Sequence, residues 1–441
     1  MQFLEALQYL LSLGHETVTM KLGLRNSQLL LEALGNPQKQ LSALQIAGTN
    51  GKGSTAAFVD SILRTAGIRT GLYTSPHLIS ITERIKIGGR EISTDNFAEL
   101  ATEVREAAEG LVRDQKLEAY PTFFEQLTAI ALLTFARSKV ELAILETGMG
   151  GRLDATTCAQ AHTVAITPID LDHEEHLGET IEKVAAEKAA IIRPGVTAVI
   201  APQSNAASEV IRERCESTKV TPVFAETSVR LEDSTRDGRF CVSFQNSGNA
   251  YKRVWLGLRG RHQIVNVSLA VAVVEALRAK GLVVPRAAII QGIEMATHPG
   301  RLEVFKEKPA FLLDGAHNPA GAQALRNYLD EFAYRPLTLI FGAMRDKRLE
   351  RMAETLFPVA DQVILTQVDN ERTAKIEVLE KLAASLVAKE RLAVTHSLKE
   401  AITVAREKTE PSGVVCVTGS LYLIGEAKGQ LQRVKEVARS I

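Results

Sequence analysis

The stretch LQIAGTNGKGSTAAFVDSILRTAG, residues 44–67, decides the fold of this chain. A short apolar run enters a glycine-rich loop, and residues 54–66 then follow helical periodicity. Glycines let successive backbone N–H groups converge on an anion, the helix N-terminus adds partial positive charge, and Lys52 can reach the outer phosphates. The spacing departs from the strict G-x-x-x-x-G-K-S/T pattern, because Gly48 precedes Gly51 by three positions. We predict a variant phosphate loop for a nucleoside triphosphate, the alternative being a glycine-rich turn with a solvated lysine.

On both sides of this loop, short apolar runs alternate with longer segments of helical period through the first 200 residues, a pattern typical of a wound parallel sheet. The predicted strands are 44–47, 70–73, 142–145, 163–167 and 198–200. The predicted helices are 54–66, 96–112, 122–135 and 179–192. We therefore expect an α/β fold that begins with a P-loop-type wound parallel-sheet ATPase domain.

The later part of the chain predicts a second domain. Short runs punctuated by Ser, Asn and Gly from about residue 230 to residue 258 first indicate an antiparallel insertion. Strand and helix patterns then alternate again, which predicts a smaller, Rossmann-like α/β domain. Because Pro and Gly punctuate residues 297–300, we place the junction there and expect domains over 1–296 and 297–441. A cleft between two such domains is the expected site.

The composition excludes several classes of protein. With 45% hydrophobic and 24% charged residues, the 441-residue chain can bury substantial cores and is not disordered. Its 52 Lys and Arg residues balance 52 Asp and Glu residues, which removes the broad positive field that nonspecific nucleic-acid binding needs. No apolar run approaches the ~18 residues of a membrane span, and the N-terminus is typical of an amphipathic helix rather than a secretory signal. Four cysteines without C-x-x-C spacing indicate neither a zinc site nor a disulfide framework, so we expect a cytoplasmic protein that binds neither nucleic acid nor membrane.

Acidic and histidine side chains follow two further predicted strands at their carboxyl ends, the edge where ligands bind in open α/β sheets. Glu146 ends one strand, and Asp170, Asp172 and His173 follow another. A carboxylate there can hold Mg²⁺, which bridges phosphate oxygens and neutralises charge that develops during phosphoryl transfer. Taken alone, Glu146 also fits a helix N-cap or a surface acid, and His173 also fits a hydrogen-bonded histidine.

Polar residues at two other places have both an ordinary and a functional interpretation. Lys188 lies in AAEKAAII, a predicted helix otherwise lined by Ala and Ile, where a lysine that extends its head to solvent is the ordinary case. Asp314, His317 and Asn318 lie in FLLDGAHNPAGA, at the end of the first strand of the C-terminal domain. Asp and Asn at such a place fit turn formers and ligand contacts equally well.

Seven segments occur in a fixed order along the chain: AGTNGKGS, YTSPHL, LETGMGGRLDATT, IDLDHEEHLG, AAEKAAI, HPGRLE and LLDGAHNP. Together they resemble the bifunctional bacterial type of the folylpolyglutamate synthase/dihydrofolate synthase family, which is Mur-ligase-like. The resemblance extends from about residue 47 to residue 318, and the final VTGSLYLIGE is similar to that family's closing strand. It implies an ATP-dependent amide ligase that adds L-glutamate to dihydropteroate and to reduced folates through an acyl phosphate.

The resemblance also implies roles for individual residues. ATP contacts are implied for Gly51, Lys52, Gly53, Ser54, Asn266, Arg301 and Asp314. Mg²⁺ ligands are implied for Ser75, Glu146 and His173, and the carbamylated lysine of the family is matched by Lys188, which would support a second Mg²⁺ ion. His317 would contact phosphate or the intermediate, so Lys52, Lys188 and His317 are the implied catalytic residues.

The family's pterin-binding segments are matched by Thr122, Phe123, Phe124, Glu125, Leu153, Asp154 and Ala155. One of the two phenylalanines could stack on a flat ring, although either fits a helix core as well. Because PTFFEQ departs from the usual TxFE context only in flanking residues, the dihydropteroate assignment is favoured and we predict both activities. A synthase that only extends folates is the alternative within the family.

Two alternatives lie outside the folate enzymes. Another Mur-type ligase, acting on a cell-wall nucleotide or a cyanophycin-like polymer, would need nucleotide or peptide contacts in place of a pterin slot. A nucleotide switch would use the phosphate loop without making a bond, and the joint presence of Lys52, Glu146, His173 and Lys188 argues against it. A monomer is the expected state for this resemblance.

Overall fold

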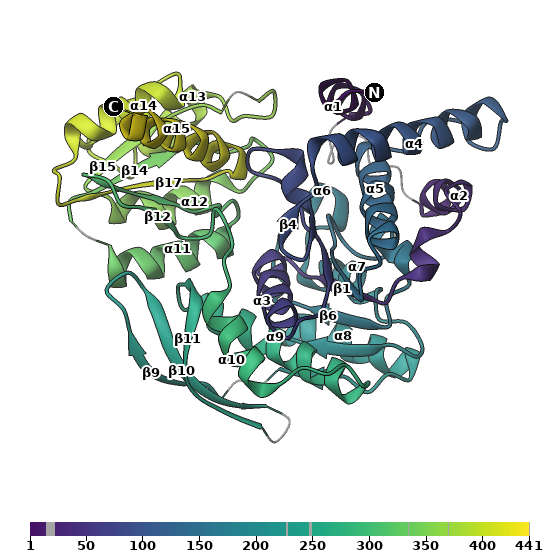
Figure 1. Ribbon diagram of the computed structural model, residues 1–441. Helices are drawn as coiled ribbons and strands as arrows, with labels where there is room; N and C mark the ends of the chain where they lie inside the picture. Colours follow the sequence, from purple (N-terminus) through teal and green to yellow (C-terminus); the bar gives the residue numbers. More distant parts are fainter. Residues whose placement is uncertain (15–22, 226–227, 247–248, 334, 369, 441) are drawn as a thin grey trace.

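The computed structural model describes residues 1–14, 23–225, 228–246, 249–333, 335–368 and 370–440. It has two lobes built on separate sheets, which lie side by side in Figure 1. We call residues 1–296 the N-terminal lobe and the residues after them the C-terminal lobe. The predicted α/β class, with a wound parallel sheet in each lobe, is confirmed.

The N-terminal lobe contains an eight-stranded sheet in the order β4-β3-β2-β5-β1-β6-β7-β8. Its strands are β1 Ala43–Ala47, β2 Thr70–Tyr73, β3 Ile85–Ile87, β4 Arg90–Glu91, β5 Leu142–Glu146, β6 Thr163–Ile166, β7 Thr197–Ile200 and β8 Val223–Phe224. From β2 to β8 all neighbours are parallel, whereas β3 and β4 form an antiparallel edge hairpin. All five predicted strands are present, and the short hairpin strands and β8 were not predicted because two or three residues carry no readable period.

Helices cover both faces of this sheet. The α-helices are α1 Phe3–Ser12, α2 Arg25–Ala33, α3 Lys52–Thr65, α4 Thr94–Arg113, α5 Phe123–Arg137, α6 Glu174–Leu177, α7 Ile181–Ala189, α8 Asn205–Thr218, α9 His262–Ala279 and α10 Arg286–Met295, and the 3₁₀ turns are η1 Pro37–Gln40, η2 Ile81–Arg84 and η3 Ala155–Ala159. On β1, Leu44 and Ile46 face a core shared with α3, α9 and α10, whereas Ala43 faces α4 and α5 and Ala47 faces α7. Alternating side chains therefore reach opposite faces, as in a parallel sheet buried on both sides.

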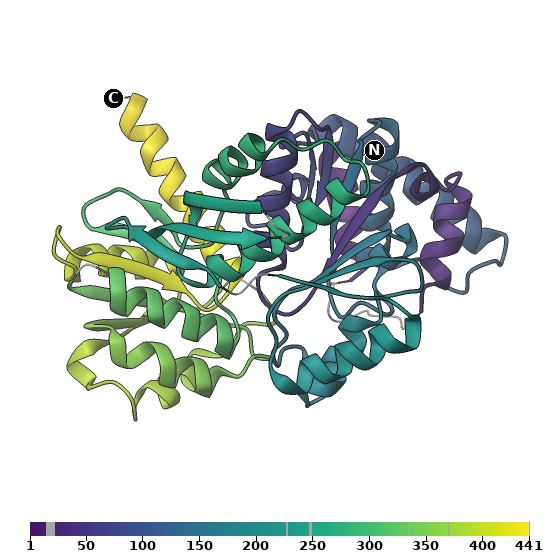
Figure 2. The same cartoon turned by 90° about the horizontal axis from the view of Figure 1, so that it is seen from below.

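The predicted antiparallel insertion is a three-stranded sheet of β9 Arg230–Ser234, β10 Arg239–Asn246 and β11 Asn249–Arg259. Its apolar face packs against α9 and α10. The sheet also extends beneath the C-terminal lobe, beside helix α11 (Pro319–Phe332), as Figures 1 and 2 show. Tyr328 of that helix donates a hydrogen bond to the carbonyl of Asp237 at 3.0 Å, and the rings of Phe332 and Phe240 pack edge to face.

The C-terminal lobe contains a six-stranded sheet in the order β12-β13-β17-β14-β15-β16, in which the edge strand β12 is antiparallel and the others are parallel. Its strands are β12 Glu303–Phe305, β13 Ala310–Leu313, β14 Leu337–Phe341, β15 Gln362–Leu365, β16 Leu392–Val394 and β17 Val414–Thr418. Besides α11, its helices are α12 Leu349–Leu356, α13 Ile376–Ala383, α14 Leu398–Lys408 and α15 Leu421–Ser440, with the 3₁₀ turns η4 Phe357–Val359 and η5 Lys389–Arg391. Within the described ranges, none of the helices has the length and apolar character to cross a bilayer.

Candidate active site

A cavity of about 550 Å³ lies between the two lobes. The N-terminal wall comes from the glycine-rich loop, the carboxyl ends of β5 and β6, and α7. The C-terminal wall comes from the loops after β13 and β14 and from the start of α15. The residues to which the resemblance assigns a role all line this cavity except Phe123, and of the other candidates Asp170 and Asp172 line it whereas Asn318 does not. The carboxyl ends of both sheets therefore face one chamber, as expected for ligand sites in α/β proteins.

The glycine-rich loop has a shape that requires its glycines. Gly51 has φ 88° and forms the N-cap of α3, and an added Cβ there would overlap the side chain of Asn266. At Gly48, with φ 146°, a Cβ would overlap the side chain of Thr167. The loop therefore runs directly over its neighbours and presents backbone amides at a helix N-terminus, the arrangement that binds phosphate.

Lys52 is the first residue of α3, and its ammonium group is held by the loop itself. Nζ donates hydrogen bonds to the carbonyls of Gly48 at 3.1 Å and Thr49 at 3.2 Å. Burial lowers the pKa of Lys52, whereas the nearby carboxyl of Glu146 acts in the opposite direction. A buried ammonium group with only neutral acceptors has much to gain from an anionic partner such as a phosphate.

Helix α9 supports the loop from behind. Asn266 Nδ2 donates to Gln263 Oε1 at 2.9 Å, and Gln263 Nε2 donates to Ser54 Oγ at 3.3 Å. All three side chains are buried. This short chain of hydrogen bonds fixes Asn266 beside Gly51, at the mouth of the phosphate loop.

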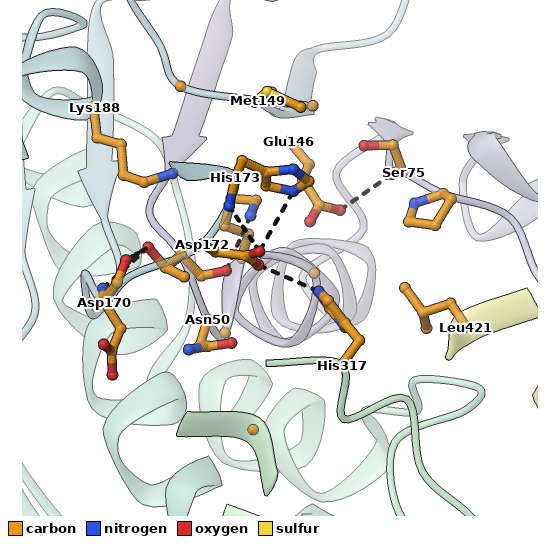
Figure 3. A pocket seen from close by; sticks show the side chains of 18 of the residues that line it. Asn50, Ser75, Glu146, Met149, Asp170, Asp172, His173, Lys188, His317 and Leu421 are labelled. Atoms are coloured by element: carbon orange, nitrogen blue, oxygen red, sulfur yellow. Dashed lines mark hydrogen bonds and ion pairs between the residues drawn. The ribbon is translucent and has the colours of Figure 1, made fainter. Parts of the chain in front are cut away.

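Ser75, Glu146 and His173 all line the cavity, as Figure 3 shows. Glu146 Oε2 accepts a hydrogen bond from the backbone amide of Ser75 at 3.3 Å, and burial raises the pKa of Glu146 despite the positive charge of Lys52. Burial lowers the pKa of His173 to about 3, so its imidazole is neutral at neutral pH and has a free lone pair.

These three residues fit a magnesium ion that is also bound by phosphate. Within the described part of the chain, no group of three His, Cys, Asp or Glu side chains is placed to hold a metal unaided. Mg²⁺ is ordinarily bound through one or two protein carboxylates together with waters and substrate phosphates. Glu146 matches that pattern, because it is a buried carboxyl group, its pKa is raised by burial, and it lies beside the phosphate loop.

Lys188 extends from α7 into the same chamber. Its Nζ donates to the carbonyl of Gly48 at 2.8 Å, and only 4% of the residue is exposed. Burial, together with the neighbouring charge of Lys52, lowers the pKa of Lys188 to about 7. A large fraction of its amine is therefore uncharged at neutral pH, which is the form that reacts with electrophiles. The structure thus excludes a solvent-directed lysine at this position.

On the C-terminal wall, Asp314 joins the segment before β12 to the loop after β13 through hydrogen bonds. Its Oδ2 accepts from the amide of Leu302 and its Oδ1 from the amide of Ala316, both at 3.0 Å. Arg301 Nη1 donates to the carbonyl of Gly315 at 3.1 Å, and Nδ1 of His317 donates to the same carbonyl at 2.8 Å. The remaining nitrogen of His317, Nε2, points toward the N-terminal lobe (Figure 3).

The segment 122–125 begins α5 and contributes unequally to the cavity. Thr122 and Glu125 form a capping box, and the Glu125 carboxylate also accepts from Ser27 Oγ at 3.0 Å. Phe124 lines the cavity and lies against Gly148, where a Cβ would overlap its ring. Phe123 points the other way, into the core, with the guanidinium of Arg84 above its ring at 5.4 Å. Of the two phenylalanines, Phe124 is the one placed to contact a ligand.

Leu153, Asp154 and Ala155 line the same side of the cavity as Phe124. The Asp154 carboxylate accepts hydrogen bonds from the amide of Met149 at 3.1 Å and the amide of Thr156 at 3.0 Å. Burial raises the pKa of Asp154, although these hydrogen bonds act against the rise. Apolar side chains beside a carboxyl group are suited to a ring that carries hydrogen-bond donors.

Several residues of the C-terminal wall were not predicted from the sequence. They lie in the loops after β14 and β15 or between the end of β17 and the first turn of α15, and they are Met344, Lys347, Arg372, Ser420, Leu421 and Tyr422. Lys347 Nζ lies 2.7 Å from Asp172 Oδ1 across the cavity. The signal that could have indicated Lys347 is its place in the loop after β14, since the strand ends of the second sheet were considered above only for its first predicted strand.

Comparison with known proteins identifies the class of protein that this fold and cavity define. Residues 46–274 match the Mur ligase middle domain, and residues 300–421 match the Mur ligase, glutamate ligase domain. The chain is therefore an ATP-dependent ligase of the Mur type. It is 34% identical over 418 residues to the dihydrofolate synthase/folylpolyglutamate synthase of Bacillus subtilis, a match covering 94% of this chain and 96% of that protein. The chain belongs to the folylpolyglutamate synthase/dihydrofolate synthase family.

Solved structures agree with this assignment. Folylpolyglutamate synthase of Mycobacterium tuberculosis complexed with ADP superposes with a TM-score of 0.89 at 32% identity, covering 97% of this chain and 98% of that one. FolC of E. coli in complex with DHPP and ADP gives 0.86 at 28% identity, covering 99% of each chain. A bifunctional synthase with Mn, AMPPNP and L-glutamate bound gives 0.83 at 28% identity, covering 98% of each chain. All three structures contain a nucleotide or a nucleotide analogue, and one of them also contains manganese.

Proposed function

We propose that this chain uses ATP to join L-glutamate to dihydropteroate and to reduced folates. One observation carries the proposal: a single cavity contains the phosphate loop, the Glu146 carboxylate, the low-pKa amine of Lys188 and the apolar wall with Phe124. Phosphate, metal and organic acid can therefore meet in one chamber. The complexes of similar enzymes with ADP, DHPP and L-glutamate support the same three ligands for this chain.

The chemistry requires an activated carboxylate, because a carboxylate oxygen is a poor leaving group. The acceptor's carboxylate takes the γ-phosphoryl group of ATP, which releases ADP and forms an acyl phosphate. The amine of glutamate then attacks the carbonyl carbon, phosphate leaves, and the amine gives up a proton as the amide forms. One difficult step is thereby divided into two easier ones.

The phosphate loop serves the first of these steps. We assign the triphosphate to the backbone amides of Gly51, Gly53 and Ser54 and to Lys52, whose ammonium group would exchange loop carbonyls for phosphate oxygens. Further nucleotide contacts are assigned to Asn266, Arg301 and Asp314. Each carboxylate oxygen of Asp314 already accepts one backbone hydrogen bond, so each has one lone pair left for a hydrogen bond from a ligand.

Ser75, Glu146 and His173 are the residues that we assign to Mg²⁺, and carbamylated Lys188 is assigned to a second ion. Bound there, the metal neutralises charge on the phosphates during transfer. Carbamylation requires the uncharged amine, and the lowered pKa of Lys188 supplies it at neutral pH. His317, with Nε2 directed into the cavity, is placed to contact phosphate or the intermediate.

The acceptor site is assigned to Thr122, Phe124, Glu125, Leu153, Asp154 and Ala155. Phe124 would stack on the pterin ring, whereas Phe123 packs in the core. The carboxyl of Asp154 would accept hydrogen bonds from the ring's donors. We further propose that the chain divides functionally at residues 296 and 297 and acts as a monomer in the cytoplasm. All four cysteines are buried and unpaired, which agrees with a reducing compartment.

An acceptor panel tests the proposal. The purified chain is incubated with ATP, Mg²⁺ and L-glutamate, and ADP release is measured with dihydropteroate, with tetrahydrofolate, or with neither. We expect acceptor-dependent ADP with both compounds and the glutamylated products by mass spectrometry. ADP release with tetrahydrofolate alone would restrict the activity to folate extension. If neither compound stimulated ADP release but a different carboxylic acid did, the chain would be a Mur-type ligase with another substrate. Slow hydrolysis independent of any acceptor would indicate a nucleotide switch.

A further inference from the structure

Asp172 lies at the centre of the cavity (Figure 3), and the roles proposed above do not include it. Only 8% of its side chain is exposed. Oδ1 accepts from the backbone amide of His173 at 2.9 Å and from Lys347 Nζ at 2.7 Å. Oδ2 accepts from Asn318 Nδ2 at 3.0 Å and lies 3.5 Å from His317 Nε2. One carboxylate of the N-terminal lobe therefore gathers three side chains of the C-terminal lobe.

These partners come from two separate segments of the C-terminal lobe. Asn318 is the N-cap of α11, since its Oδ1 accepts from the amide of Gly321 at 2.8 Å, and its Nδ2 also lies 3.1 Å from Asn50 Oδ1 in the phosphate loop. Lys347 follows β14 and is as buried as Asp172, with 8% of its side chain exposed. A buried ammonium group is strongly stabilised by an opposite charge in contact with it. Asp172 thus fixes both segments relative to the phosphate loop.

A second ion pair joins the same two regions but lies at the surface. Arg348 contacts Glu174 through two hydrogen bonds, of 2.6 Å and 2.5 Å, and 47% of the arginine side chain is exposed. Exposed ion pairs contribute little, because water and salt screen them. Glu174 therefore provides a matched control, two residues away in sequence, for the buried carboxylate.

We propose that Asp172 is a positioning residue that holds the two lobes together in the arrangement that places Lys347 and His317 over the metal-binding face. Its charge compensates the buried ammonium of Lys347, and its two oxygens divide their hydrogen bonds between the lobes. Asp172→Asn removes the charge but retains an oxygen that can accept from the amide of His173. The substitution removes the charge that compensates Lys347, although the oxygen can still accept from Nζ, and its new NH₂ group meets the donor Nδ2 of Asn318 with a donor of its own. The contacts with the C-terminal lobe are therefore weakened while the hydrogen bond from His173 is kept.

The distance between the lobes tests this directly, without any acceptor. Glu179→Cys and Arg351→Cys place nitroxide labels on exposed residues on either side of the contact, and the native cysteines are buried. In the otherwise unchanged chain we expect one short distance by pulsed electron resonance. With Asp172→Asn the distribution should broaden to longer distances, and with Glu174→Gln it should not. Lys347→Met removes the partner of Asp172 in the C-terminal lobe, so it should broaden the distance distribution in the same way. The test therefore remains informative if one of the two variants folds poorly.

Kinetics provide the second test, and only this part rests on the proposed function. Loss of one partner of a buried charge pair should lower kcat by roughly 30-fold or more, while KM for ATP changes less than about threefold because the phosphate loop is intact. Glu174→Gln should stay within about threefold of the parent in both. The double variant with Asp172→Asn and Lys347→Met should be no slower than the slower single variant.

Two results would overturn the inference. One is an unchanged distance distribution in both Asp172→Asn and Lys347→Met. The other is a double variant whose loss equals the product of the single losses, since two independent structural defects would combine in that way. A chain that accepts neither dihydropteroate nor folates would refute the proposed function but leave the distance measurement, and hence the inference, standing.

Discussion

The two walls of the cavity are built in different ways. On the N-terminal wall the polar groups bond within their own lobe: Lys52 and Lys188 both donate to the carbonyl of Gly48, and Glu146 accepts from the amide of Ser75. On the C-terminal wall Asn318 and Lys347 donate across the cavity to the other lobe. The phosphate loop is therefore formed by one lobe alone, whereas the completed site, which includes Arg301 and Asp314, exists only when the lobes are in contact.

Lys52→Ala should have the largest effect, because it removes the cation of the self-contained wall. We expect ligation to fall by about 10²- to 10³-fold or more, the loss typical of a preorganised group that stabilises developing charge. KM for ATP should rise as well, since Lys52 meets the phosphates before and during transfer. Initial rates of ADP release measure both quantities. Lys39→Ala, an exposed lysine of the same lobe, serves as the control and should behave like the parent, whereas parental turnover in Lys52→Ala would contradict the assignment.

Lys188→Ala separates a structural lysine from one that acts through a carbamate. We expect a loss of about 10²-fold, with partial recovery in acetate or formate, because a small carboxylate can enter the space and replace the carbamate oxygens. Lys183→Ala on the same helix is exposed and should need no rescue. If Lys188→Ala were active without added carboxylate, the role of Lys188 would be structural, limited to joining α7 to the carbonyl of Gly48.

The pH dependence of the parent enzyme follows from the same lysine. Burial lowers the pKa of Lys188 from 10.5 to about 7, so the amine is mostly neutral above that pH and mostly protonated below it. Since only the neutral amine takes up carbon dioxide, activity at a fixed low level of dissolved carbon dioxide should rise roughly tenfold between pH 6 and pH 8. Added bicarbonate should reduce the dependence. A flat profile under limiting carbon dioxide would contradict a carbamate requirement.

The sequence predicted the N-terminal wall better than the C-terminal wall for a physical reason. Glycine spacing, strand ends and helical period are local signals, and they located the phosphate loop, Glu146 and the parallel strands that carry them. The pair of Asp172 and Lys347 joins residues 175 positions apart, and nothing in either neighbourhood marks the other. The same applies to Phe123 and Phe124, because consecutive residues of a helix point in different directions and only the packing of α5 decides which of them enters the core.

Asn318 permits the smallest and most specific change to the C-terminal wall, because its side chain both caps α11 and extends to Asn50 and Asp172. Asn318→Ala removes both functions and should lower the free energy of unfolding by about 1 kcal/mol, the ordinary value of a lost N-cap. Asn318→Ser keeps a capping oxygen but is too short to cross the cavity, so stability in urea should return to that of the parent. If the wall depends on contact between the lobes, kcat of the serine variant should remain about threefold low while KM for ATP is unchanged, because the phosphate loop keeps its own hydrogen bonds. If both stability and turnover recovered in Asn318→Ser, Asn318 would act only as the N-cap of α11. Its contacts with Asn50 and Asp172 would then not contribute to turnover, and this position would not support the difference between the two walls.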